Sequence, residues 1–440
     1  MNRRQLLKTT GLAAGAALLT GIQGFTQPSK ITFGVLGGGK ISFGQGMLRG
    51  AQLAVGEINA KGGVLGRQLA IEFADLDTES DPTLAKSAMQ SLIIDKKVDA
   101  VAGVFRSEML PGFVPDIPRL RKPILITGST TGGTDNVNKD YDNFKYLFRS
   151  VIIGTNALVA DAIGFVRGFV MPIATGGALG TSSNKLALLG EDLVSSRGFR
   201  GAIEPALKAA GIDVVTNLSI AVGTTDFGPI INQLQNSGAS VAYTFLSDPN
   251  LSVLFPAATA AAKLKMAVFG INAPLQLDTA AIATRGGATG TVITDFAGEV
   301  AVTNKTKGFF DAYRKQFNER PVYTSLTTYD TVYVIAEAMT RAGSANADDV
   351  VAALEKTNYV GGGGLIKYYT RQQENDKVPL AVAHNTVYST SPTQVLGASY
   401  DGVAPIHTQI FVDGNNVKRD TVWPKEIATA QYQLPPVFRG

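Results

Sequence analysis

Side chains that commonly carry out catalysis are scarce in this sequence of 440 residues. Cysteine is absent, which excludes disulfides, thiolate metal sites, a cysteine nucleophile and a lipidated N-terminal cysteine. The two histidines, His384 and His407, are not at metal-ligand spacing, and a serine triad would need one of them. We therefore predict no catalytic residue, no metal site and no cofactor, with each histidine on the surface or hydrogen-bonded in a core.

One glycine-rich stretch resembles a phosphate-binding loop. Residues 34–40 are GVLGGGK, and they follow an apolar run that is typical of a strand. Ile41 stands where such a loop needs Ser or Thr to hold Mg²⁺, and the glycines do not form GxGxxG. We interpret the stretch as a backbone loop at the carboxyl end of a first strand, where open α/β sheets bind their ligands.

The N-terminus has the pattern of an export signal. Residues 2–8 are NRRQLLK, and residues 9–22 are apolar and rich in Gly and Ala, too short for the about 20 residues of a membrane span. We predict a cleaved signal over residues 1–24. The pair Arg3 and Arg4 favours the twin-arginine route, with a general secretory signal as the alternative.

Removal of this signal changes the charge of the chain. Without Arg3, Arg4 and Lys8 the formal net charge falls from +4 to +1. The remainder has no cluster of Lys and Arg interleaved with aromatic residues, so we do not expect nucleic acid as a partner. Together with the missing lipidation cysteine, these features predict a soluble periplasmic protein.

The length and the residue pattern predict two α/β lobes. A chain of 440 residues exceeds the usual size of one hydrophobic core, and 45% hydrophobic with 17% charged residues is typical of a folded globular protein. Strand-like and helix-like periods alternate from residue 30, as in parallel βαβ units. The glycine run 361–364 is interpreted as flexible, either a crossover between lobes or a surface loop. The expected strands are 30–36, 69–74, 98–104, 124–127, 186–189 and 241–245, and the expected helices include 46–60, 84–94 and 327–341.

Two segments carry a family resemblance. Residues 42–55 (SFGQGMLRGAQLAV) and 57–67 (EINAKGGVLGR) resemble the start of type I periplasmic binding proteins, in particular the leucine/isoleucine/valine-binding group of ABC transporters. The similarity continues at Asp75, 80–82, 98–103 and 123–130, and more weakly at 186–189, 225–227 and 422–424.

The resemblance implies two Rossmann-like lobes joined by a hinge of three crossovers. The first lobe would contain residues 29–149 and 296–358, and the second lobe residues 150–295 and 359–440. Such a hinge lets the lobes close as rigid bodies, and a ligand in the cleft biases that equilibrium toward the closed state.

The resemblance also implies ligand-binding residues in the first lobe. Ser107 and the turn Gly128, Ser129 and Thr130 match positions that hold a ligand carboxylate and ammonium, and Phe43 matches an aromatic wall of the cleft. Hydroxyl and backbone N–H groups stabilise an anion without a buried counter-charge. The structural alternatives are loop hydroxyls that cap a helix and a core phenylalanine.

In the second lobe, Ser195 and Leu246 match tyrosine positions of the family, and Asn272 matches an acidic residue that pairs the ligand ammonium. Asparagine cannot supply that charge, although Asp192 or Asp248 could substitute. A hydroxy or keto acid, an aromatic carboxylate or an amide therefore stays open as the ligand. Arg106 and Glu108 also depart from the small or neutral residues usual beside the loop serine.

The resemblance thus implies a non-enzymatic, exported solute-binding protein. It would capture a small organic ligand, an amino acid or a related carboxylate or amide, and deliver it to a membrane permease of an ABC transporter. Two alternatives remain. The same fold could present its ligand to a sensory receptor, or a twin-arginine signal could export a cofactor enzyme.

Overall fold

Five parallel strands form the sheet of the first lobe, in the order β2-β1-β3-β4-β5. The computed structural model describes residues 29–76, 80–389 and 401–439, so the predicted export signal lies outside the described residues. The inner strands are continuous apolar runs because helices cover both faces of a parallel sheet. The strands are β1 Ile31–Gly37, β2 Leu69–Asp75, β3 Ala100–Gly103, β4 Ile124–Ile126 and β5 Leu147–Arg149.

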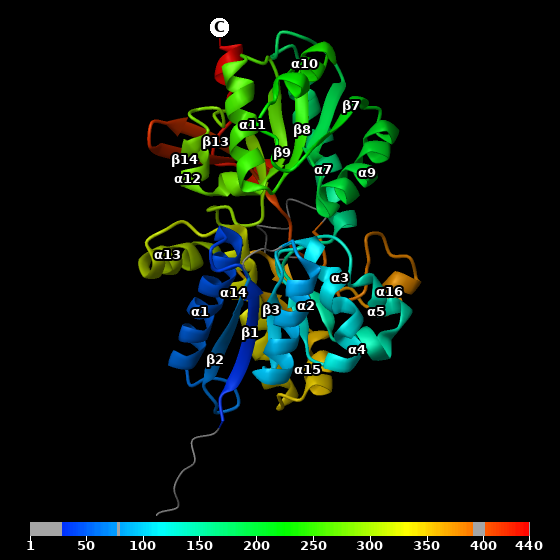
Figure 1. Ribbon diagram of the computed structural model, residues 1–440, viewed down its shortest axis with the longest axis vertical. Coiled ribbons are helices and arrows are strands. Elements are labelled where there is room, and N and C mark those ends of the chain that lie inside the picture. The colour runs from blue at the N-terminus through cyan, green and yellow to red at the C-terminus, as the bar shows by residue number, and fades with distance from the viewer. Residues whose placement is uncertain (1–28, 77–79, 390–400, 440) are drawn as a thin grey trace, which may run out of the picture.

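Helices from distant parts of the sequence cover this sheet. The most extensive helix pair is α1 Ser42–Ala60 against α14 Tyr323–Ala342, so the chain returns to the first lobe late in the sequence (Figure 1). Asp81 accepts hydrogen bonds from the N–H groups of Thr83 and Leu84 and thereby starts α2. The other helices are α2 Pro82–Gln90, α3 Leu110–Phe113, α4 Ile117–Leu120, α5 Asp135–Lys139, α6 Tyr141–Phe144, α13 Thr306–Phe317, α15 Ala347–Leu354 and α16 Arg371–Asn375.

The second lobe has a seven-stranded sheet in the order β14-β13-β10-β9-β8-β6-β7. A C-terminal hairpin that the sequence pattern does not reveal adds β13 antiparallel to β10. The strands of the seven-stranded sheet are β6 Lys185–Glu191, β7 Asp213–Ile220, β8 Val241–Leu246, β9 Ala267–Asn272, β10 Val292–Asp295, β13 Ile406–Asp413 and β14 Asn416–Trp423. Its helices are α7 Thr155–Phe165, α8 Met171–Thr175, α9 Val194–Ala209, α10 Gly228–Asn236, α11 Pro249–Ala261 and α12 Asp278–Ala283.

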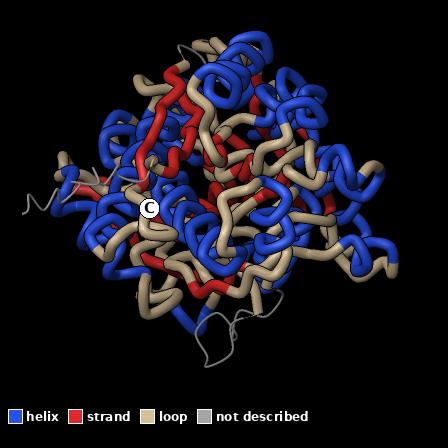
Figure 2. Tube along the Cα trace, turned by 90° about the horizontal axis from the view of Figure 1, so that it is seen from below, coloured by secondary structure: helices blue, strands red, loops and turns tan. Residues whose placement is uncertain are grey.

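One helical stretch of the second lobe, Thr155–Thr175, is long and apolar enough to cross a membrane. Half of its apolar window is buried inside the protein, and Phe165 stacks on His407 with ring centroids 3.7 Å apart. Core packing therefore accounts for its composition. In the view along the long axis most strands lie in the interior with helices around them, whereas some strands reach the edge of the molecule (Figure 2). The predicted fold class, two Rossmann-like α/β lobes, is confirmed.

The chain passes between the lobes three times. It leaves the first lobe after β5 and returns after β10. Val403 still belongs to the first lobe, where it forms β-bridges with Gly364 and Tyr388, and the third crossing lies between Val403 and β13. The sequence assigns residues 359–440 to the second lobe, but residues 359–388 pack against the first. Asn385 pairs with Arg149 at the end of β5, and α16 lies beside α5 (Figure 1).

The glycine run explains this difference. Gly361 to Gly364 are buried, and two of their N–H groups donate to the Asp330 carboxylate of α14, at 3.0 Å from Gly362 and 3.1 Å from Gly363. A Cβ at Gly361 would lie 2.4 Å from an Asp330 oxygen. The run is therefore a buried anchor to the first lobe, held by close backbone approach, and neither a flexible surface loop nor a crossover. The hairpin of β11 Tyr359–Val360 and β12 Leu365–Ile366 flanks it.

Candidate ligand-binding site

A cavity of about 60 Å³ lies between the lobes, at the carboxyl ends of strands from both sheets. Open α/β sheets bind ligands at this edge. The volume is small beside the about 300–1,000 Å³ of common ligand pockets, so the lobes must part for a ligand to enter. The lining residues are Phe105, Arg106, Ser107, Gly128, Ser129, Thr130, Ile152, Leu158, Ser195, Phe245, Ser247, Ile271, Ala273, Gln276, Thr294, Phe296 and Tyr323.

Two loops of the first lobe supply a hydroxyl cluster. Ser107 follows β3 and Ser129 follows β4, and their Oγ atoms lie 2.8 Å apart. The N–H of Thr131 donates to the Ser107 Oγ at 3.3 Å, and the Tyr323 hydroxyl donates to the Gly128 carbonyl at 2.9 Å. A Cβ at Gly128 would lie 2.8 Å from the Phe105 Cα, so the two loops approach as closely as they do only with glycine there.

A buried arginine holds the second of these loops. The Arg149 side chain donates to the carbonyls of Ser129 at 2.8 Å and Gly132 at 2.6 Å, and to Thr134 and Asn385 at 2.8 Å each. Its partners are all neutral, and burial lowers the pKa of Arg149 to about 10, so it stays protonated near neutral pH. The sequence reasoning missed this residue, although a cation that ends an apolar strand is a signal that could have found it.

Aromatic side chains from both lobes form the apolar walls. Phe105 and Tyr323 line the first-lobe side, Phe245 lines the second-lobe side, and Phe296 lies at the crossover after β10, in contact with Tyr323. Phe43, which the resemblance implies as a wall, is 2% exposed and stacks behind Phe105 with ring centroids 4.4 Å apart. It supports the wall without lining the cavity.

In the second lobe two of the predicted residues each come one position after a residue that lines the cavity. In the parallel pair of β8 and β9, Phe245 is opposite Ile271 and Leu246 is opposite Asn272. Because strand side chains alternate between faces, Phe245 and Ile271 line the cavity, whereas Leu246 and Asn272 face α11. The Asn272 amide accordingly donates to the Ser252 carbonyl at 3.3 Å. Of the predicted residues, Ser107, Gly128, Ser129, Thr130 and Ser195 line the cavity.

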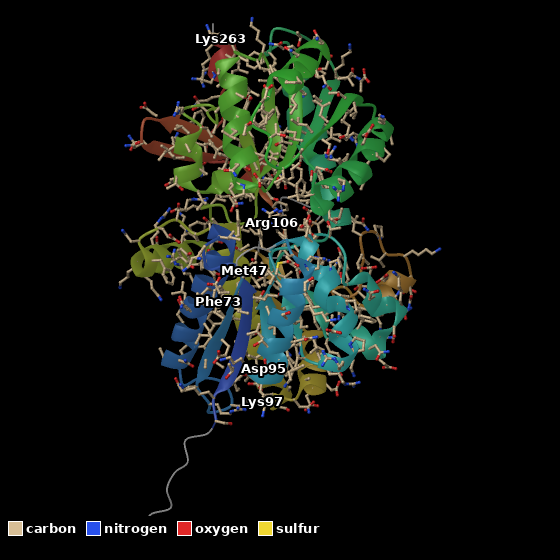
Figure 3. All side chains as sticks on the ribbon, viewed as in Figure 1. Met47, Phe73, Asp95, Lys97, Arg106 and Lys263 are labelled. Carbon is tan, nitrogen blue, oxygen red and sulfur yellow. The ribbon has the colours of Figure 1, made fainter. Side chains whose placement is uncertain are left out.

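Arg106 and Glu108 bridge the two lobes. The Arg106 guanidinium, which lies at the boundary between the lobes (Figure 3), donates to the Ser247 carbonyl at 3.3 Å and to its Oγ at 3.4 Å. One Glu108 oxygen accepts from the Val194 N–H at the start of α9, at 2.8 Å. Both contacts close the cleft beside the cavity.

The acidic residues of the second lobe near the cleft are already engaged. Glu191 is fully buried and accepts from the N–H groups of Ser247 at 2.8 Å and Asp248 at 2.7 Å, and burial raises its pKa in spite of these bonds. Asp192 pairs with Arg197, and Asp248 caps α11 through the N–H groups of Asn250 and Leu251. Neither of the two predicted substitutes for an acidic ligand contact lines the cavity.

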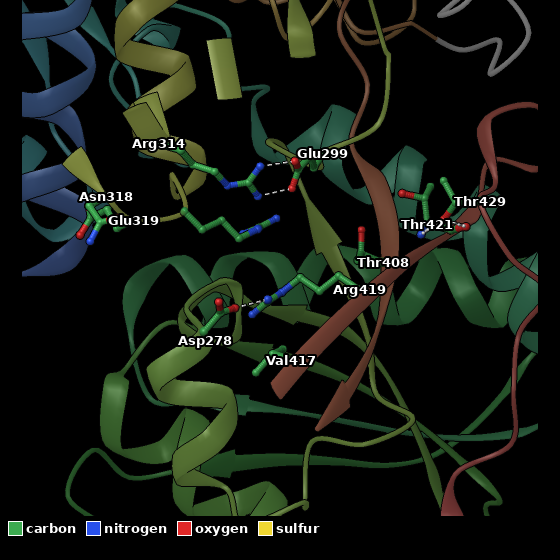
Figure 4. Close-up of a pocket in the computed structure, with 11 residues that line it drawn as sticks. Asp278, Glu299, Arg314, Asn318, Glu319, Thr408, Val417, Arg419, Thr421 and Thr429 are labelled. Carbon is green, nitrogen blue, oxygen red and sulfur yellow. Dashed lines mark hydrogen bonds and ion pairs between the residues drawn. The ribbon is translucent and has the colours of Figure 1, made fainter. Parts of the chain in front are cut away.

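A larger cavity of about 510 Å³ lies where α13 faces the C-terminal hairpin (Figure 4). Charged residues dominate its lining, but each has an ion-pair partner: Arg314 pairs with Glu299 and Arg419 with Asp278, while Glu319 and Arg320 pair with Arg49 and Asp295 outside the cavity. None of the predicted site residues lines it. These paired and partly exposed charges leave no aromatic wall for an organic ligand.

Both histidines have structural partners. His384 Nε2 lies 3.0 Å from a Glu355 oxygen and its ring stacks on Phe148, and His407 Nε2 lies 3.3 Å from Asp161 in the second-lobe core. In the part of the chain that the structure describes, no three His, Asp or Glu side chains group as they would around a metal ion.

Comparisons with known proteins agree with this architecture. The family model described as periplasmic binding protein matches residues 31–383. Leu/Ile/Val-binding protein homolog 8 of Brucella melitensis biotype 1 is 25% identical over 377 residues, which cover 83% of this chain and 90% of the relative.

Two solved structures share the fold. The branched-chain amino acid transporter substrate-binding protein LivJ of Streptococcus pneumoniae, in complex with isoleucine, has a TM-score of 0.68 at 20% identity and covers 90% of this chain and 99% of its own. A solute-binding protein of an ABC transporter from R. palustris, in complex with 4-hydroxybenzoate, has a TM-score of 0.70 at 17% identity and covers 92% of this chain and 98% of its own.

Proposed function

Because this chain belongs to the periplasmic binding protein family, we propose that it captures a small organic carboxylate, an amino acid or an aromatic acid, between its lobes and delivers it to the membrane permease of an ABC importer. The proposal includes export of the chain to the periplasm, with residues 1–24 as the cleaved signal. It assigns binding, not catalysis, to the cavity.

The observation that carries the proposal is the composition of the interlobe cavity. Hydroxyl and backbone groups of Ser107 and the Gly128–Thr130 turn meet aromatic side chains from both lobes. The polar end suits a carboxylate and the aromatic walls suit an apolar body. A ligand that touches both lobes stabilises the closed form by its differential affinity for that form.

The ligands of the two structural neighbours support this chemistry. One neighbour holds isoleucine and the other 4-hydroxybenzoate. Both compounds carry a carboxylate on an apolar body, so a carboxylate group is the chemical feature that we carry over to this chain.

The test is a thermal-shift screen of amino acids and aromatic carboxylates on the purified protein. A ligand at about 100 times its dissociation constant stabilises the native state by about 2.7 kcal/mol. We expect Ser107→Ala combined with Thr130→Ala to abolish the ligand-induced shift, because two hydroxyls of the polar end are lost. The unliganded melting temperature should fall modestly, because the Ser107 hydroxyl also bonds to Ser129 and Thr131. Ser87→Ala, on the exposed side of α2, is the matched control. An undiminished shift in the double variant would remove the site assignment.

A further inference from the structure

The described lining of the interlobe cavity contains a cation and no anion. Among the described side chains that line it, Arg106 carries a positive charge and none is acidic. Arg106 makes two long hydrogen bonds to neutral Ser247 atoms, and no carboxylate lies within ion-pair distance of it among the described residues. The wall of the cavity therefore has a cation to which the described residues offer no ion-pair partner, although the buried Glu191 carboxylate, bonded to the same Ser247, interacts with it at longer range.

A second cation lies directly behind the polar end of the cavity, where the hydroxyl cluster is. Arg149 is 2% exposed, and its Nε donates to the carbonyl of Ser129, whose own Oγ lies in the hydroxyl cluster. In the described part of the chain no carboxylate lies within ion-pair distance of it either. In a poorly hydrated site, two such charges stabilise an anion and disfavour a further cation.

The nearby acidic residues do not line the cavity, and most of their oxygens accept hydrogen bonds from other groups. Both oxygens of Glu191 accept hydrogen bonds from Ser247, one of them also from the Asp248 N–H. Glu108 binds the first turn of α9 through one oxygen; its other oxygen is buried without a hydrogen-bond partner among the described residues, but Glu108 does not line the cavity. An amino acid bound here would bury an ammonium group in a cavity whose described lining contains no carboxylate. Burial of an unpaired charge is strongly unfavourable.

On the basis of the proposed function, we propose that the ligand is a monocarboxylate without an ammonium group, with a small aromatic or other apolar body. Its carboxylate lies at the hydroxyl cluster, in the positive field of Arg106 and Arg149. Its body lies between Phe105, Phe245, Phe296 and Tyr323. Arg106 is then a residue that determines specificity for anions.

Matched ligand pairs test this proposal by isothermal titration calorimetry on the purified protein. The pair 4-methylpentanoate and L-leucine has one carbon skeleton and differs by the ammonium group, as does the pair 3-phenylpropanoate and L-phenylalanine; benzoate is a fifth probe. In at least one pair, we expect the member without the ammonium group to bind with an affinity at least about tenfold higher than that of its amino acid. Equal or tighter binding of the amino acids would overturn the inference and leave the proposed function intact. Absence of binding by all five probes would count against both.

Variants of Arg106 give an independent readout. Arg106→Gln keeps a donor for Ser247 but removes the charge, and Arg106→Lys keeps the charge. We expect the Gln variant to bind the tightest carboxylate probe about tenfold less tightly, with a smaller loss in the Lys variant and unchanged unliganded melting temperatures. Unchanged affinity in Arg106→Gln would show that this charge does not select the ligand.

Discussion

Asp330 is a buried carboxylate whose hydrogen-bond partners are backbone groups. It accepts from Gly362 and Gly363, and no cation lies within ion-pair distance of it among the described residues. Burial raises the pKa of Asp330 to about 6, from an ordinary value of 3.8, although the two backbone bonds oppose the shift. The residue therefore couples the packing of the glycine run to proton binding.

This coupling predicts a pH-dependent stability difference. Because the folded-state pKa lies above the unfolded one, the stabilising contribution is complete below about pH 4 and is lost as the pH rises through about 6. Asparagine does not titrate, so the free energy of unfolding of the wild type, relative to Asp330→Asn, should fall by on the order of 3 kcal/mol between pH 4 and pH 8. Urea denaturation of both proteins across this range measures the difference, and other titrating groups cancel. Parallel curves would contradict the assignment.

At the residue scale, the family resemblance located the first-lobe half of the cavity better than the second. Ser107 and the turn 128–130 directly follow strands whose apolar runs are clear, so their positions are fixed to the residue. In β8 and β9 both faces are apolar, and the pattern does not show which face meets the cleft. The prediction was therefore off by one residue in each strand: it named Leu246 and Asn272, whereas Phe245 and Ile271 line the cavity.

At the scale of the elements, the contact between α1 and α14 joins two segments that are far apart in the sequence. Gly50 lies at this contact, where a Cβ would come within 2.1 Å of the Ser325 carbonyl oxygen. Gly56, six residues later in the same helix, is exposed, and a Cβ there would meet nothing within 4 Å. The two glycines thus differ in packing but share a helix.

We predict opposite effects for the same substitution at these positions. Gly56→Ala should stabilise the protein by up to about 1 kcal/mol, because alanine loses less backbone entropy in a helix. Gly50→Ala has the same helical gain, but it forces α1 and α14 apart and should destabilise the protein by about 1–3 kcal/mol. Chemical denaturation of the two variants and the wild type measures both values. Equal effects would mean that the helices do not pack as closely as described.

The elements that the sequence predicts well are those of the parallel βαβ units. Residues 30–36 and 46–60, for example, correspond to β1 and α1, since buried strands and amphipathic helices have different periods. The C-terminal hairpin was not predicted, because its outer strand begins as a mostly polar run, NVKRDT, without the apolar alternation that indicates a strand. The four glycines of 361–364 indicated flexibility in the sequence. In the structure they allow the backbone to pack closely against Asp330, a residue of a separate helix, and the local sequence does not reveal that contact.

At the scale of the whole molecule, the hinge and the interlobe bridges control access to the cavity. Three chain crossings connect the lobes, and on the cleft side the bridges Arg106 to Ser247 and Glu108 to Val194 span the gap. Because the partners of each bridge belong to different lobes, parting of the lobes would break both bridges. They therefore stabilise the closed form at the expense of the open form that admits the ligand.

Removal of one bridge should shift this equilibrium without a change in the cavity lining, to which Glu108 does not belong. A hydrogen bond to a charged group contributes roughly 1.5–3 kcal/mol, less where solvent reaches it, so Glu108→Ala should lower the closed population and weaken ligand binding by about tenfold. Small-angle scattering should show a larger radius of gyration for the unliganded variant than for the unliganded wild type, and the same radius for both proteins at saturating ligand. Glu426→Ala, at an exposed position outside the cleft, is the control and should leave affinity and radius unchanged. If the radius of the wild type did not decrease with any bound ligand, closure around the ligand would be excluded, and the bridges would be only static contacts between fixed lobes.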